Sequence, residues 1–171
     1  MARKTQLTNA SRLALAAALF TFAAIEAYFI YTTRTSPPPF AGEWRLESFT
    51  TVAADGRTSP SPFAAGRLSY DGAGHVSAQL TYANRPPLGA DAGDEARAAA
   101  QRSYLAYYGT YTVDTVNARV THHVEASTNP DWPRTDLVRA YRFLDEGRTL
   151  ELTIRDAAGR ATDTLVWRRL S

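Results

Sequence analysis

The sequence predicts an all-β domain, an eight-stranded up-and-down antiparallel barrel with one short helix, preceded by an N-terminal apolar helix. From Gly42 onward, apolar and polar residues alternate with a period of two, and turn sequences recur at short intervals. One alanine-rich stretch between the third and fourth strands has helical character. Successive hairpins favour an up-and-down barrel, and a sandwich of two sheets is the main structural alternative.

The first 31 residues have the composition of an export signal or an N-terminal membrane anchor. Basic residues come first, and an apolar run just long enough to span a bilayer follows from Leu13 to Tyr31. Glu26 lies inside this run and would be costly at the bilayer centre. A Ser/Pro-rich linker at 32–41 comes next. Because positive charge precedes the apolar run, both alternatives place the domain outside the cytoplasm, as an exported or membrane-anchored protein.

Eight strands account for the pattern of the domain at 42–171. They are expected at 42–52, 66–71, 75–83, 106–114, 118–127, 135–145, 148–155 and 161–170. Four connections begin with aspartate and suit hairpin turns: DGAG at 71–74, DTVN at 114–117, DEG at 145–147 and DAAG at 156–159. Residues 91–104 are expected to form the helix, with Asp91 as its N-terminal cap.

Composition excludes several classes of function. The chain has no cysteine, which excludes a disulfide framework, a thiol nucleophile and a cysteine-based zinc site. Outside residues 1–31 the basic and acidic side chains balance, and the arginines are scattered, so no nucleic-acid partner is expected. The sequence also has no G-x-S-x-G elbow, no phosphate-binding loop and no metal-ligand spacing, so we expect no metal and no cofactor.

Both ends of the domain carry a more specific feature. The first strand opens with GEW, from Gly42 to Trp44, and the last closes with LVWRR, from Leu165 to Arg169. The G-x-W opening resembles the lipocalin signature. That resemblance implies that Trp44 plugs the floor of the barrel and that Arg168 or Arg169 packs over its ring. A cation over an indole face stabilises by about 0.5–2 kcal/mol.

Longer segments extend this resemblance. They are GEWRLESF, GRLSYDGAGHVSAQL, YLAYYGTYTVD, VTHHVEASTNPDW and LVWRR. In order and spacing they are similar to the lipocalin-like domain family of bacteria and fungi, over essentially all of residues 40–170. The resemblance implies a calycin-type barrel, and some family members look like accessory or cyclising proteins beside biosynthetic genes. The leader at 1–31 departs from the usual bare domain.

Two adjacent histidines interrupt the strand at 118–127. Neighbouring side chains on a strand point to opposite faces, so His122 and His123 do not face one cavity. Val120 and Val124 share a face with His122, which predicts that His122 points inward and that His123 lies outside beside Glu125. An inward His122 is either a core residue bonded to polar neighbours or a polar anchor, or general acid or base, in a ligand cavity.

Other side chains of the predicted inner faces complete the candidate ligand site. Besides His122, these candidates are Tyr70, Gln79, Tyr107, Tyr111, Arg139 and Tyr141. Alternation with Ala78 and Leu80 predicts that Gln79 lies outside, whereas the family resemblance suggests that it lines the cavity, so both orientations remain open. Arg139 beside His122 suits a ligand with a carboxylate head and an apolar body; alternatively it pairs with an internal acid or faces outward. The loops 84–91 and 129–132 are candidates for the rim of the barrel mouth.

The sequence therefore favours binding of a small, mostly apolar or amphipathic molecule inside a barrel outside the cytoplasm. Two alternatives remain open. One is a cofactor-free cyclase, isomerase or hydrolase that uses His122 in the same cavity. The other is an envelope-anchored interaction module whose barrel is filled by side chains. If the segment at 1–31 is uncleaved, the membrane is a further partner.

Overall fold

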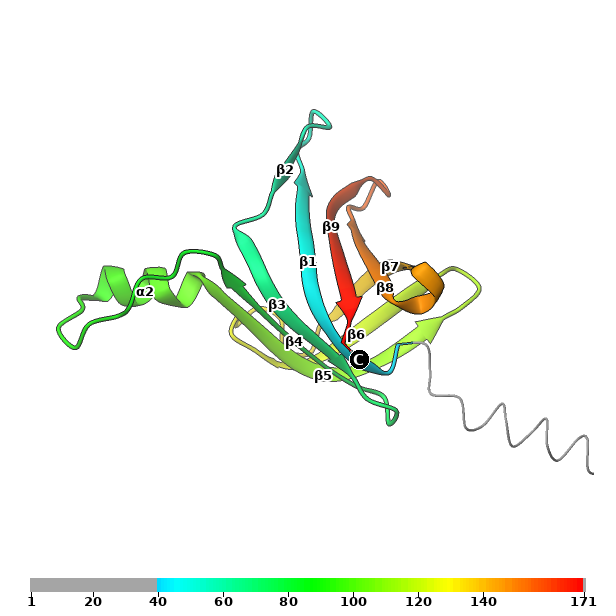
Figure 1. The fold of residues 1–171 in the computed structure, drawn as a ribbon, viewed down its shortest axis with the longest axis horizontal. Coiled ribbons are helices and arrows are strands. Elements are labelled where there is room, and N and C mark those ends of the chain that lie inside the picture. Colours follow the sequence, from blue (N-terminus) through cyan, green and yellow to red (C-terminus); the bar gives the residue numbers. More distant parts are fainter. Residues whose placement is uncertain (1–39, 171) are drawn as a thin grey trace, which may run out of the picture. The chain divides into compact units, whose positions relative to one another are not determined.

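The computed structural model describes residues 40–170, which form a closed antiparallel β-barrel with one short α-helix (Figure 1). The expected leader at 1–31 and most of the linker at 32–41 lie outside the described residues. The strands and helices are β1 (Gly42–Val52), β2 (Thr58–Pro60), β3 (Phe63–Tyr70), β4 (His75–Tyr82), α2 (Asp94–Arg102), β5 (Tyr104–Asp114), β6 (Arg119–Ser127), β7 (Asp136–Leu144), the 3₁₀ turn η1 (Asp145–Gly147), β8 (Thr149–Arg155) and β9 (Ala161–Arg169).

The strands pair in the order β2-β1-β3-β4-β5-β6-β7-β8-β9, and β1 also pairs with β9, which closes the barrel. All these pairings are antiparallel. The predicted barrel of eight long strands is confirmed, and the sandwich alternative is wrong. β2 was not predicted; this short strand pairs only with the end of β1 and lies outside the ring of eight.

Three of the tight hairpins are held by the aspartate that begins each turn. Oδ1 of Asp71 accepts hydrogen bonds from the backbone N–H groups of Ala73 and His75. Asp114 and Asp156 bind the amides of their own turns in the same manner. A short carboxylate can satisfy turn amides that have no partner in the sheet, and for this reason these three turn sequences mark the strand ends correctly. At the fourth turn, Asp145 instead accepts from the hydroxyl of Thr149.

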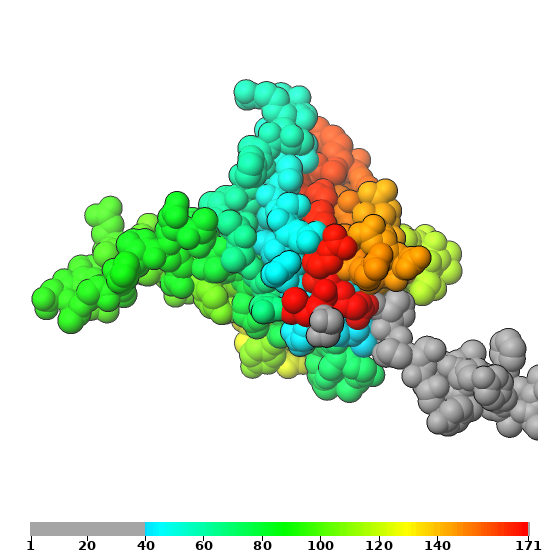
Figure 2. Space-filling view, viewed as in Figure 1, coloured from blue at the N-terminus to red at the C-terminus, as the bar shows by residue number. Residues whose placement is uncertain are grey.

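The connection between β4 and β5 differs most from expectation. The helix spans only Asp94–Arg102, its N-cap is Gly93, and no side chain caps it, so the predicted cap at Asp91 is wrong. Acidic residues in the first turn instead place negative charge at the positive end of the helix. No residue of α2 is buried, and the connection stands away from the barrel as an arm (Figures 1 and 2). It is therefore neither a plug nor a closed lid.

The inner face of the barrel follows the alternation in the sequence. On β6, Val120, His122 and Val124 are buried, and on β4 the buried residues are Val76, Ala78 and Leu80. Opposite Glu125 the β5–β6 register shifts at a bulge, where Gly109 packs against the neighbouring backbone. A Cβ at Gly109 would overlap with the carbonyl oxygen of His123. Glycine at this position therefore lets β6 approach β5 closely enough to bring His122 against the interior of β5.

One end of the barrel is closed by the G-x-W opening and the terminal arginine. The guanidinium carbon of Arg169 lies 4.1 Å from the ring centroid of Trp44, so Arg169 is the arginine that covers the tryptophan. Arg168 instead faces outward and binds Glu47 and Asp145. Gly42 has φ +138°, and a Cβ there would lie 2.5 Å from Nη1 of Arg169. Glycine is thus required both for the backbone conformation and for the approach of the guanidinium.

Phe40 belongs to the packed domain, although the sequence analysis assigns it to the linker. Its side chain is buried, and its carbonyl accepts a 3.0 Å hydrogen bond from Nε1 of Trp44. The carbonyl of the next residue, Ala41, accepts from Nη1 of Arg169 at 2.6 Å. These two bonds hold the entering chain across the Trp44 end of the barrel.

Candidate ligand-binding site

Aromatic side chains fill the half of the barrel near Trp44. Phe40 lies in their midst, with ring centroids of Tyr70, Tyr141 and Phe143 at 5.2, 4.8 and 5.0 Å, each in an edge-to-face arrangement. The ring of Tyr111 packs against Tyr70 at 4.8 Å. Tyr111 and Tyr141, two of the predicted ligand-binding residues, therefore lie among packed aromatic rings, and neither lines the cavity described below.

His122 lies at the centre of the barrel between two tyrosine hydroxyls. The residue is only 1% exposed. Its Nε2 is 2.6 Å from the hydroxyl of Tyr70, and its Nδ1 is 2.8 Å from the hydroxyl of Tyr107. The three side chains come from β3, β5 and β6, so the closed sheet brings together residues that are distant in sequence. The predicted inward orientation of His122 is confirmed, and both of its ring nitrogens have partners.

The surroundings of the two tyrosine hydroxyls determine the direction of both hydrogen bonds to His122. Tyr70 is buried, and within residues 40–170 its hydroxyl has no hydrogen-bond partner other than Nε2 of His122. The hydroxyl of Tyr107 likewise has no partner there other than Nδ1 of His122, but Tyr107 borders the cavity described below, where its proton can meet another acceptor, and Tyr70 does not. We therefore assign the proton of Tyr70 to Nε2, because a buried O–H without an acceptor costs about 1–3 kcal/mol. The imidazole proton is then on Nδ1 and is donated to the oxygen of Tyr107. This arrangement leaves the hydroxyl proton of Tyr107 uncommitted.

The hydrogen-bonded side chains of Tyr70, His122 and Tyr107 are all uncharged near neutral pH. Burial, with smaller contributions from the positive charge of Arg139 and from His123, lowers the pKa of His122 to about 3. Burial raises the pKa of Tyr107 to about 12 and that of Tyr70 well above its ordinary value. These three side chains therefore form a neutral hydrogen-bonded unit in an apolar core, without a group that ionises near pH 7.

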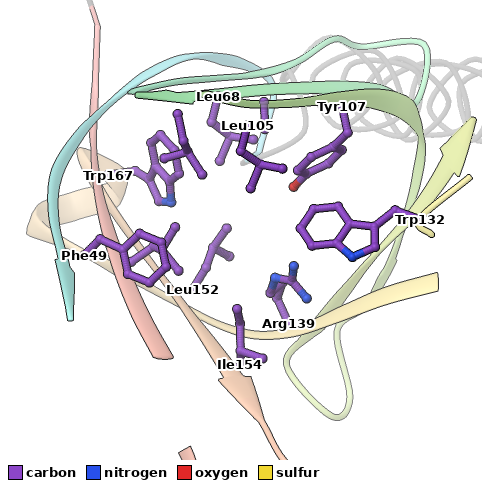
Figure 3. A pocket seen from close by; sticks show the side chains of 12 residues that line it. Phe49, Leu68, Leu105, Tyr107, Trp132, Arg139, Leu152, Ile154 and Trp167 are labelled. Carbon is purple, nitrogen blue, oxygen red and sulfur yellow. The ribbon is translucent and has the colours of Figure 1, made fainter. Parts of the chain in front are cut away.

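A cavity of about 70 Å³ lies on the other side of Tyr107 (Figure 3). Most of its wall is apolar, from strands on all sides of the barrel. The lining residues are Phe49, Leu68, Ala78, Leu80, Leu105, Tyr107, Trp132, Arg139, Leu152, Ile154, Leu165 and Trp167. Leu68, Ala78 and Trp167 form buried wall, whereas Phe49, Trp132 and Arg139 are half-buried, so the cavity reaches the mouth of the barrel.

The polar side-chain groups of this cavity are hydrogen-bond donors. The indole N–H of Trp167 is buried and is the only buried side-chain polar group of residues 40–170 without a hydrogen-bond partner. Tyr107 and Arg139 extend toward the same space from opposite walls (Figure 3). Arg139 bonds only the carbonyl of Val138, at 3.1 Å, and no carboxylate of the described residues lies within ion-pair distance. The predicted alternative that Arg139 pairs with an internal acid is therefore wrong.

The remaining candidates of the sequence analysis lie elsewhere. Gln79 is on the outer face of β4, where it lines a surface groove with Arg45 and Arg67, so the alternative that it faces the interior is wrong. Alternation predicted this, because its neighbours on both sides are core residues. His123 faces outward as predicted, but its partner is Asp136, whose Oδ1 lies 2.7 Å from Nδ1, rather than Glu125. The bulge opposite Gly109 displaces Glu125 from the regular register.

Of the residues that line the cavity, only Tyr107 and Arg139 were among the predicted ligand-binding residues. The aromatic residues that were missed are Trp167 and Phe49. Trp167 could have been predicted from the sequence, since it alternates with Leu165 on the last strand and therefore shares its inner face. Phe49 follows a register shift in β1 between Leu46 and Ser48, which breaks the simple alternation. The loop 129–132 was predicted to rim the mouth, and its Trp132 does line the cavity. The loop 84–91 instead belongs to the protruding arm.

Comparison with known proteins identifies the family of this chain. The model of the lipocalin-like domain matches residues 41–170, most of the chain. The chain belongs to the lipocalin-like domain family. Among solved structures it is similar to a redesigned β-barrel, with a TM-score of 0.38 and 12% identity over 78% of this chain and 93% of that one. No curated protein matches the chain.

Two further properties of this lipocalin-like domain concern metals and membranes. Within residues 40–170, no group of three or more histidine or acidic side chains is placed to hold a metal ion. Over the same residues, no helix has the length and apolarity needed to cross a bilayer.

Proposed function

We propose that this lipocalin-like domain binds a compact, mostly apolar molecule in the cavity between Tyr107, Arg139 and Trp167. The observation that carries the proposal is the buried indole N–H of Trp167, which has no hydrogen-bond partner among the described residues and belongs to the cavity wall. A buried donor without a partner costs about 1–3 kcal/mol, and a ligand that accepts from it removes this cost. The basic and apolar leader at 1–31 supports a location outside the cytoplasm.

The volume of the cavity limits the size of the enclosed ligand. Pockets for drug-sized molecules have about 300–1,000 Å³, and a cavity of roughly 150 Å³ takes benzene. A cavity of about 70 Å³ is smaller than this and therefore encloses only a short chain or part of a larger ligand. A longer ligand would extend past the half-buried side chains of Phe49 and Trp132 at the mouth.

Binding is favoured over acid–base catalysis by the state of the central residues. A general base works best when its pKa lies near the working pH. The pKa of His122 is lowered to about 3, and both of its nitrogens are already bonded to tyrosines. Tyr107, with its pKa raised to about 12, can donate a hydrogen bond but does not act as a base near neutral pH.

The direct test is native mass spectrometry of the full chain purified from its own host. We expect a bound small molecule in the wild type and its loss in Ala78→Leu, because residue 78 lies in the buried cavity wall and the larger side chain fills the space. The matched control is Ala73→Leu in the exposed β3–β4 turn, which should keep the adduct. A wild type without any adduct, or an adduct retained by Ala78→Leu, would contradict the proposal.

A further inference from the structure

The cavity contains hydrogen-bond donors without matching acceptors. Its side-chain polar groups are the guanidinium of Arg139, the hydroxyl of Tyr107 and the indole N–H groups of Trp132 and Trp167. Arginine and tryptophan can only donate. Tyrosine can also accept, but the oxygen of Tyr107 already receives the Nδ1 proton of His122 when the buried hydroxyl of Tyr70 is satisfied. The hydroxyl of Tyr107 therefore presents its proton to the cavity.

The charge of the cavity wall also favours an anionic ligand. No aspartate or glutamate lines the cavity, and within residues 40–170 no carboxylate pairs with Arg139. By contrast Arg142, on the outer face of the same strand, is bound by both carboxylate oxygens of Glu151, at 3.1 and 3.0 Å. The guanidinium of Arg139 is therefore available to bind an anion, and its planar set of donors suits the two oxygens of a carboxylate.

We propose that the ligand is a compact organic anion, a carboxylate or an enolate, whose charged oxygens lie between Arg139 and Tyr107. This inference rests on the proposed ligand-binding function and specifies the chemical class of the ligand. The apolar body of the anion lies against Leu68, Leu152 and Leu165, which line the same cavity. A further acceptor atom on that body, such as a carbonyl oxygen, receives the indole N–H of Trp167. Neutral molecules with donor groups are disfavoured, because the cavity offers their protons no acceptor.

The role of His122 follows from this assignment. His122 is absent from the residues that line the cavity, so we expect it to act on the ligand only through Tyr107. It directs the proton of Tyr107 by donating to the tyrosine oxygen while accepting from Tyr70. His122 is therefore a positioning residue that makes Tyr107 a donor toward the anion.

Calorimetric titration of the full chain with matched acid and amide probes tests the proposal. The probes are benzoate, phenylacetate and hexanoate, each paired with its primary amide of nearly the same shape. We expect each acid that binds to do so at least tenfold more tightly than its amide, since hydrogen bonds to a charged group are roughly twice as strong as neutral ones. Arg139→Met keeps the length of the side chain and should remove this preference, leaving both probes weak.

Controls separate the anion from the general ligand-binding function. Arg142→Met removes a guanidinium from the outer face of the same strand and should leave the acid preference unchanged. Arg139→Lys should retain part of the preference, because the charge remains without the planar guanidinium. Amides that bind as tightly as acids, or a preference that survives in Arg139→Met, would overturn the anion while leaving ligand binding intact. Absence of binding by all six probes would overturn the anion proposal, whereas the ligand-binding function itself is decided by the adduct in native mass spectrometry.

Discussion

At the scale of single residues, the central feature is a buried histidine that stays neutral between two tyrosines. Its 1% exposure and its two hydrogen bonds explain why the strand tolerates a polar side chain inside the core. The same burial lowers the pKa of His122 to about 3, with the charges of Arg139 and His123 acting in the same direction. Because of this low pKa, we expect His122 to make the folded domain less stable in acid.

The first prediction concerns stability against pH. Below the ordinary histidine pKa near 6.5, the unfolded chain binds a proton that folded His122 does not bind until about pH 3. The stabilisation is therefore complete above pH 6.5 and is lost as pH falls through this window, by roughly 1.4 kcal/mol per unit. From pH 7 to pH 4.5 we expect urea unfolding to show a loss of about 2–3 kcal/mol from this residue.

His122→Gln should flatten this pH dependence. Neutral glutamine also offers one donor and one acceptor direction but does not titrate, so the variant is less stable at pH 7 yet loses less on acidification. His75→Gln is the control, because His75 is an exposed histidine bound to Asp71 at 2.6 Å. Below pH 6.5, the free energy of unfolding of His75→Gln should fall with pH as steeply as that of the wild type. Equal slopes in His122→Gln and the wild type would contradict the prediction, because they would mean that folded His122 has the ordinary histidine pKa.

Prediction of single residues from sequence succeeds where alternation suffices. The valines that flank His122 on β6 were enough to predict that it points inward. Its partners could not be predicted, because Tyr70 is 52 residues away and the pairing depends on closure of the sheet. The cavity itself depends on the combined shapes of side chains from many strands, which no one strand pattern contains. Gln79 shows the opposite error, since the resemblance suggested an interior position where alternation correctly predicted the outer face.

At the scale of elements, the ends of β1 and β9 close the barrel through one side chain. Arg169 packs over Trp44, donates from Nη1 to the carbonyl of Ala41 at 2.6 Å and from Nε to that of Gly147 at 3.2 Å. The sequence indicated an arginine over this tryptophan but left two neighbouring candidates. The strand register decides between them, because Arg169 is the residue paired with Trp44 across β1 and β9.

The second prediction tests this closure. Arg169→Met should destabilise the domain by about 1–3 kcal/mol, because it removes the cation from the indole face and leaves two carbonyls without their donor. Arg168→Met, one residue earlier, removes outward ion pairs to Glu47 and Asp145 and should cost less than about 1 kcal/mol. Chemical unfolding of the two variants measures the difference. An equal cost in both would mean that Arg169 acts only through surface charge.

The third prediction concerns the protruding arm between β4 and β5. The variant replaces residues 83–102 by Asn-Gly, so that a two-residue hairpin turn connects Tyr82 to Ser103. The backbone N–H of Tyr82 already donates a 3.0 Å hydrogen bond to the carbonyl of Ser103. Because no residue of α2 is buried, we expect the melting temperature to change by only a few degrees. Probe affinity should also stay the same. A loss of folding or of binding would show that the arm contributes to the barrel or its mouth.

At the scale of the whole molecule, the barrel is filled at one end and hollow toward the other. Phe40, Trp44 and the aromatic residues around them close the first end, and the chain of Tyr70, His122 and Tyr107 separates this packed half from the cavity. The sequence indicated an interior with several phenols and one guanidinium. It did not indicate that Tyr111 and Tyr141 pack among other aromatic rings while Tyr107 lines the cavity, because in both roles the tyrosine lies on an inner strand face.

The most direct test of the central claim follows the three tryptophan indole N–H signals of the full chain by NMR during titration with the tightest of the six probes. Trp167 lines the cavity and has no hydrogen-bond partner among the described residues, so its signal should move most. Trp44 already donates to Phe40 in the closed half, and its signal should stay in place. Binding that leaves Trp167 unmoved, or that shifts Trp44 instead, would contradict a ligand site in this cavity.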